Sequence, residues 1–187
     1  MIQITVGKLD GIAGEQNPVM VAFGKPTPFS CIVRNELNGL RKMNEVVYST
    51  NADGSKGVPY MPRQFPVGTW ALEMPGVRSD PLLAPYFIPT TAWQLVDEWD
   101  VEQRDDGEHY IGKTGRQVKD YAYGIHCSTA HESDGCIHIV DDIKVTLKDD
   151  GTPKTKYDYL DDIVHSLIEW IRDPSMAQPP EIQVTGI

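Results

Sequence analysis

The chain has 187 residues, of which 40 % are apolar and 24 % are charged, a composition that is typical of a globular protein and excludes a disordered one. The length suits one domain spanning residues 1–187. The net charge of -10 repels phosphate backbones and argues against a nucleic-acid partner, and no run approaches the ~20 apolar residues that span a bilayer, so we expect no membrane insertion.

Short runs of β-forming residues separated by Gly and Pro fill the first half of the chain. They predict strands at Ile2 to Val6, Pro18 to Phe23, Phe29 to Val33, Val46 to Ser49 and Thr69 to Leu72. Between Pro75 and Asp106, prolines and large aromatics interrupt the pattern, which predicts a long ordered loop or flap. Turn residues on both sides of His109 to Ile111 predict a small hairpin there.

The clearest helix signal lies near the C-terminus, over Asp158 to Arg172. Apolar residues recur there at three- and four-residue steps, which predicts an amphipathic helix that packs one face on a sheet. Pro174 ends it, and a final run from Glu181 to Ile187 predicts an edge strand. The chain is therefore expected to be mainly β with peripheral helices, one of them this C-terminal amphipathic helix.

Histidine and cysteine concentrate in Gly124 to Val140, which reads GIHCSTAHESDGCIHIV. A zinc site, a nucleophilic cysteine with a histidine base, and a buried strand with incidental thiols are the three interpretations. Zinc ligands usually come in spaced pairs, whereas His126 and Cys127 are adjacent and point to opposite faces of an extended chain, so we expect no metal. Burial as a small apolar side chain is the common fate of a lone cysteine, and for Cys136 it stays open.

The surroundings of Cys136 favour the nucleophile. Gly135 predicts a turn just before it, and alternation places Cys136 and His138 on one face of a strand, with the isoleucines in the core. The backbone N–H groups of Gly135 and Cys136 could face a developing oxyanion. A tight excursion between two strands brings His126 beside Cys136, where an imidazole can accept the thiol proton.

At these residues the chain resembles the L,D-transpeptidases, the YkuD-type catalytic domain. That family places a Gly-His pair before Ser-His-Gly-Cys, then an apolar residue and usually Arg or Asn; the matching residues here are His126, Ser133, Asp134, Gly135, Cys136, Ile137 and His138. A second match lies at Arg63 to Leu72, RQFPVGTWAL, preceded by VVYST, and the resemblance runs with gaps from about Ile2 to Val184.

The chain departs from the family pattern at three points. Asp134 replaces a histidine, His138 replaces Arg or Asn, and the interval from His126 to Cys136 is short. The short interval, together with an N-terminal sequence, MIQITVGKLDG, that has no signal-peptide features, is similar to the L,D-transpeptidase-like effectors of type VI secretion systems.

The resemblance implies a mixed β-sandwich fold and peptidoglycan stem peptides as substrate. Cys136 would be the nucleophile and His126 the base, the backbone carbonyl of Cys127 would orient the imidazole, and Gly135 would belong to the catalytic turn. Substrate contacts are expected at Ser133, Asp134, His138 and Tyr123, although His131 and His138 are more typical of satisfied or solvated histidines.

The resemblance also implies where such a protein acts. No cofactor is expected, and an immunity protein is a candidate partner. The protein would be made in the cytoplasm without a signal peptide and would act in the periplasm of a target cell after export independent of the Sec pathway. The alternative is a β-rich binding or structural module, of phage type, that acts on peptidoglycan or keeps the motif without activity.

Overall fold

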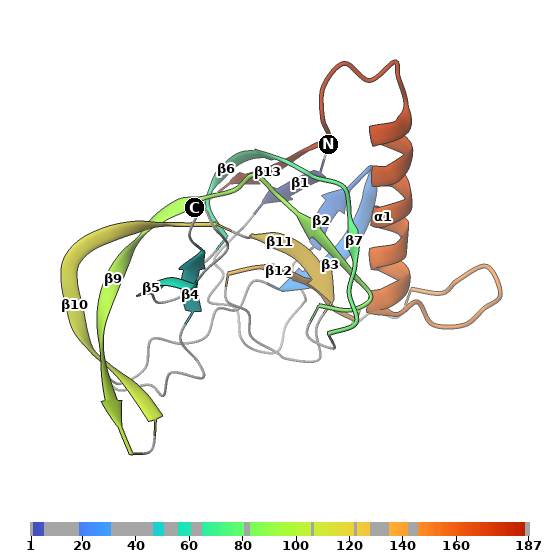
Figure 1. Cartoon of the computed structure of the whole chain (residues 1–187). Helices are drawn as coiled ribbons and strands as arrows, with labels where there is room; N and C mark the ends of the chain where they lie inside the picture. Colours follow the sequence, from blue (N-terminus) through green and yellow to red (C-terminus); the bar gives the residue numbers. More distant parts are fainter. Residues whose placement is uncertain are drawn as a thin grey trace.

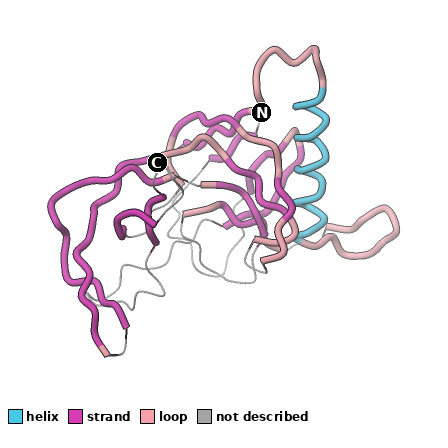
Figure 2. Tube along the Cα trace, in the orientation of Figure 1, coloured by secondary structure: helices cyan, strands magenta, loops and turns pink. Residues whose placement is uncertain are grey.

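The computed structural model describes residues 2–5, 19–30, 47–50, 56–60, 65–80, 83–105, 107–121, 123–127, 135–141 and 146–185. These residues form a mainly β structure with one helix (Figures 1 and 2). The helix is α1 (Lys156–Arg172), and the strands are β1 (Ile2–Thr5), β2 (Val19–Ala22), β3 (Lys25–Ser30), β4 (Val47–Thr50), β5 (Lys56–Tyr60), β6 (Gly68–Ala71), β7 (Gly76–Val77), β8 (Tyr86–Pro89), β9 (Gln94–Arg104), β10 (Gly107–Asp120), β11 (Gly124–Cys127), β12 (Ile137–Ile139) and β13 (Glu181–Thr185).

The described strands form two sheets. One has nine strands in the order β6-β13-β1-β2-β3-β12-β11-β8-β7, and the other has four in the order β10-β9-β5-β4. The larger sheet is mixed, because β1 pairs with β13 and β11 with β12 in parallel while its other pairs are antiparallel. The mainly β fold with a C-terminal helix is thereby confirmed.

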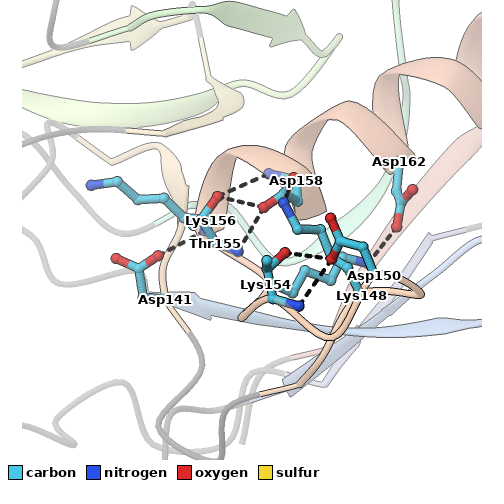
Figure 3. A network of polar contacts seen from close by, with 9 residues as sticks. Asp141, Lys148, Asp150, Lys154, Thr155, Lys156, Asp158 and Asp162 are labelled. Atoms are coloured by element: carbon cyan, nitrogen blue, oxygen red, sulfur yellow. Dashed lines mark hydrogen bonds and ion pairs between the residues drawn. The ribbon is translucent and has the colours of Figure 1, made fainter.

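Helix α1 begins at a capping box. The Thr155 hydroxyl accepts from the Asp158 backbone N–H, and the Asp158 carboxylate accepts from the Thr155 backbone N–H in return. Around this first turn lies a polar network in which Lys154 pairs with Asp162 (Figure 3). The predicted amphipathic helix is confirmed and starts two residues before the predicted Asp158.

The core lies between α1 and the centre of the larger sheet, where α1 contacts β8, β11 and β12. One face of β11 and β12 contributes Ile125, Ile137 and Ile139, and α1 contributes Leu160 and Leu167, each at most 1 % exposed. Burying a side chain of this size contributes about 1.5–3 kcal/mol. Because side chains alternate along a strand, the residues of β11 and β12 between these apolar ones point to the opposite face of the sheet.

Three sequence-based expectations are wrong. The flap predicted between Pro75 and Asp106 contains β7, β8 and the long strand β9. The hairpin exists but turns near Asp105, and β10 continues through His109 to Ile111, with a register irregularity between Tyr110 and Gly112. The C-terminal strand β13 is not at an edge, since it lies between β6 and β1.

Each error has a local physical cause. Pro89 ends β8, so that proline marks a strand boundary and not a loop. In β9 only alternate residues are buried, with Val96 fully buried and Leu95 half-exposed, and charged residues hide this alternation. Figure 1 shows the β9–β10 hairpin curving away on the side of the molecule opposite α1.

Candidate active site

A row of residues crosses five neighbouring strands of the larger sheet. Pairing registers join Gly76 to Phe87, Phe87 to His126, His126 to His138, and His138 to Ser30. Side chains of directly paired residues lie on the same face of a sheet. This face is opposite to the one that packs on α1, and it carries both histidines of the motif.

Cys136 belongs to the same face. It directly precedes β12, and side-chain alternation along the strand places it with His138, while Ile137 and Ile139 are buried in the core. Cys136 forms no disulfide and is half-buried. Gly135 before it has φ +107°, a backbone conformation that other residues rarely adopt, so the glycine permits the turn that presents Cys136.

The strands that hold His126 and Cys136 are parallel neighbours. β11 and β12 pair in register from Ile125 with Ile137 to Cys127 with Ile139. The sequence predicts that a short excursion brings the two strands together, and their pairing agrees with that prediction. Parallel pairs usually need a crossover of a dozen or more residues, so a site on so short a connection is compact.

The His126 side chain is held in one tautomer. Its Nδ1 lies 2.8 Å from the backbone carbonyl oxygen of Cys127, and a carbonyl can only accept, so Nδ1 carries the hydrogen. In a neutral imidazole, Nε2 is then free of hydrogen and can accept a proton. This is the contact with the Cys127 carbonyl that the family resemblance implies.

His138 packs against His126. The two ring centroids are 4.4 Å apart in an edge-to-face arrangement, and each side chain is 4 % exposed. Burial, followed by the neighbouring His126, lowers the pKa of His138 from 6.5 to about 3, so this imidazole is neutral at physiological pH. His138 therefore gives His126 an uncharged, tightly packed neighbour. Binding of substrate by His138 stays a prediction.

Phe87 packs against His126 on the side away from His138. Its ring centroid lies 5.7 Å from that of His126. The ring also leans over Gly124, because a Cβ built on Gly124 would lie 2.3 Å from the Phe87 Cζ. The absence of a side chain at Gly124 thus makes room for the ring that packs on the base.

The two described cysteines differ chemically. The Cys127 thiol is completely buried, and its S–H donates to the backbone carbonyl of Lys156 at 3.3 Å. Burial raises its pKa to about 12, so it stays protonated and unreactive. Cys127 can serve the site only through its backbone carbonyl, as the resemblance implies.

Tyr123 lies in the core, away from solvent. Its side chain is 1 % exposed and packs on Phe65, and its hydroxyl donates to the buried Asp120 carboxylate and accepts from Gln94 at 2.6 Å. Burial and the Asp120 carboxylate raise the pKa of Tyr123, with a smaller contribution from Cys136. Tyr123 is thus part of the support beneath the site, and its binding of substrate stays a prediction.

Some predicted site residues lie outside the described residues, namely Ser133, Asp134 and His131. Within the described ranges no group of three or more His, Cys, Asp or Glu side chains could hold a metal ion. The one described helix lacks the length and apolar character to cross a membrane.

Two residues near the site escape sequence reasoning, Phe87 and Arg78. Phe87 is reached only through the pairing of β8 with β11, and Arg78 lies over the Phe87 ring at 5.9 Å from its centroid. No motif marks either residue. The prolines around them merely predict a loop, so only the strand register brings them to the site.

No protein-family model matches the chain, and neither a curated protein nor a solved structure matches it. The likeness to L,D-transpeptidases therefore rests on the motif residues and on the geometry around His126 and Cys136.

Proposed function

We propose that the protein is a cysteine-dependent enzyme that acts on peptidoglycan stem peptides as an L,D-carboxypeptidase or L,D-transpeptidase. The observation that carries the proposal is the bond from His126 Nδ1 to the Cys127 carbonyl, 2.8 Å long. It leaves Nε2 to accept a proton, in a ring that shares a sheet face with the half-buried thiol of Cys136. A base held in one tautomer on the same face as a thiol suits cysteine acyl transfer.

The reaction follows from these groups. His126 accepts the thiol proton, and the Cys136 sulfur attacks the carbonyl carbon of the third stem residue. The backbone N–H groups of Gly135 and Cys136 stabilise the oxyanion. The bond to the terminal D-alanine then breaks, its amine takes the proton from His126, and a thioester remains on Cys136. Water releases a tripeptide, whereas the amine of another stem forms a new cross-link.

The surroundings of the base support this chemistry. His126 lies between the neutral His138 ring and the Phe87 ring, with centroids 4.4 and 5.7 Å away. Such packing keeps water and counter-charges away from the imidazole and fixes its plane. A positioned base of this kind typically contributes 10²–10⁴-fold to rate.

The proposed place of action rests on the family resemblance. We propose an antibacterial effector that is made in the cytoplasm and delivered to the periplasm of a target cell, where peptidoglycan stems are its substrate. An immunity protein in the cell that makes it is the proposed partner.

Turnover of a purified tetrapeptide stem tests the enzyme directly. The wild type should release D-alanine and leave a tripeptide, and Cys136→Ala should abolish this release without changing the melting temperature, because a half-buried thiol contributes little packing. Cys31→Ala, which removes another thiol, is the matched control and should keep full activity. Activity in Cys136→Ala, or its equal loss in Cys31→Ala, would reject the nucleophile. Folded wild type without turnover would favour the binding module.

A further inference from the structure

Arg78 is a cation beside the site that lacks an acidic partner in the described part of the chain. Its side chain is exposed, and no ion pair joins it to a carboxylate among the described residues. The chain carries 27 acidic residues and a net charge of -10, so acidic partners are abundant. An exposed guanidinium that no described carboxylate pairs with, on a strongly acidic protein, is suited to bind an anion that comes from outside.

The sheet register places Arg78 on the face of the motif histidines. Gly76 pairs with Phe87, so both face the same side, and Arg78 follows Gly76 by two residues. The guanidinium turns back over Gly76, where a Cβ would lie 3.6 Å from its Nη1. It also lies over the Phe87 ring, 5.9 Å from the centroid. An aromatic ring under a guanidinium holds it flat, with its edge free for hydrogen bonds.

One ring separates this guanidinium from the base. Phe87 contacts Arg78 on one side and His126 on the other, with centroid distances of 5.9 and 5.7 Å. A substrate bound along this face, where an extended peptide advances about 3.3–3.6 Å per residue, can place a charged group toward Arg78 while its reacting carbonyl lies near His126. The Arg78 guanidinium is thus placed to bind a substrate group near the reacting bond, and not to take part in the reaction itself.

We propose that Arg78 is a specificity-determining residue that binds a carboxylate of the substrate. The inference rests on the proposed function, because the substrate of that reaction carries free carboxylates on both sides of the reacting bond. One is the terminal carboxylate of the leaving D-alanine, and the other is the side-chain carboxylate of a diamino-diacid third residue. A planar guanidinium binds either one through two parallel hydrogen bonds.

The charge of Arg78 also bears on position 138, where this chain has a histidine and the resembled family usually has Arg or Asn. There the sequence carries a histidine that the structure buries as a neutral ring, so this position supplies no cation. Arg78, reached through β7 and β8, places a positive charge on the same face from a distant part of the chain.

Steady-state kinetics with amidated substrates test the inference. Arg78→Gln should raise KM for the free tetrapeptide about tenfold or more, the loss expected for one charge-assisted pair, and leave kcat nearly unchanged. Arg78→Lys keeps the charge but not the planar guanidinium, so its KM should lie between those of the wild type and Arg78→Gln. Arg172→Gln, at the end of α1, removes an equal charge elsewhere and should change nothing.

Amidation identifies the carboxylate. When the carboxylate that Arg78 binds is amidated, the wild type should already have a raised KM. Arg78→Gln should then raise the KM no further. Amidation of the other carboxylate should leave the full effect of the substitution in place. An Arg78→Gln variant with wild-type KM for the free substrate, or with an equal loss on every substrate, would overturn the inference.

Binding separates this inference from the proposed function. In a Cys136→Ala background, calorimetric titration with the tetrapeptide should show affinity that Arg78→Gln weakens about tenfold or more. If wild type shows no turnover but binding depends on Arg78, the enzyme proposal fails and the carboxylate site stands. If wild type turns over and Arg78→Gln is silent in both assays, only the carboxylate site fails. Absence of both turnover and binding would reject both.

Discussion

At the scale of single residues, the candidate site consists of a histidine between two rings. His126 donates through Nδ1 to the Cys127 carbonyl and packs on His138 and Phe87. Two imidazoles in contact cannot both be charged at low cost in a buried setting, and His138 is the one that burial keeps neutral. His138 thus packs against His126 as a buried, uncharged ring, whereas an arginine at this position would carry a positive charge.

The buried His138 predicts a pH dependence of folding. Its pKa is about 3 when folded, lowered by burial and by His126, against an ordinary value of 6.5. Between these two pKa values, His138 is protonated in the unfolded chain but neutral in the folded protein. Stability from this group is therefore complete above about pH 6.5 and falls as the pH falls toward 3, by at most about 1.4 kcal/mol per pH unit.

Urea unfolding of wild type and His138→Gln between pH 4 and 8 measures this effect. The variant should be less stable at pH 8, because it loses the ring contact, but its unfolding free energy should fall less steeply toward pH 4. His165→Gln, which changes an exposed histidine on α1, is the control and should keep the wild-type slope. Parallel curves for wild type and His138→Gln would show that His138 is not buried as a neutral ring.

At the scale of elements, the site depends on the close approach of β8 to β11. Gly124 of β11 leaves space for the Phe87 ring, and a Cβ there would lie 2.7 Å from the Ile88 backbone carbonyl as well. Since backbone cannot swing aside as a side chain can, the two strands would have to separate. The glycine therefore couples strand spacing to the position of the ring that packs on His126.

We predict that Gly124→Ala destabilises the fold by about 1–3 kcal/mol, the usual cost of overpacking, and reduces turnover as Phe87 moves. Urea unfolding gives the first value and D-alanine release the second. Gly112→Ala in β10 is a matched control, because no atom lies within 4 Å of a Cβ there. Equal stability and activity of the two variants would contradict the proposed packing.

The sequence predicts local elements better than it predicts their neighbours. The strand runs, the amphipathic helix and the paired histidine and cysteine follow from composition and alternation within short windows. The edge-to-face contact of His126 with His138, the contribution of Phe87 and the place of Arg78 depend on which strands lie side by side. That order joins β7 and β8 to β11 and β12 over long stretches of sequence, and no short motif specifies it.

At the scale of the whole molecule, the proposed function predicts that toxicity depends on both the Cys136 thiol and delivery to the periplasm. Cytosolic expression should be harmless, because cross-linked stems are absent there. Fusion to a Sec signal should make the wild type toxic in a Gram-negative host, with tetrapeptides depleted and tripeptides gained among the muropeptides.

The Sec-fused Cys136→Ala variant, with export verified, is the control and should allow normal growth. Equal growth and identical muropeptides for the two fusions would argue against an antibacterial effector. Lysis with intact stems but cut glycan or cross-bridges would indicate an endolysin of another specificity.

The most direct test of the central claim is the mass of the intact protein after exposure to a carbapenem, a β-lactam that acylates reactive thiols. The account predicts one adduct, located on Cys136 by peptide mapping, absent in Cys136→Ala and formed far more slowly in His126→Ala. Cys127 should stay unmodified, because burial raises its pKa to about 12. An unmodified wild type, or an adduct that persists in Cys136→Ala, would contradict the claim that Cys136 is the nucleophile.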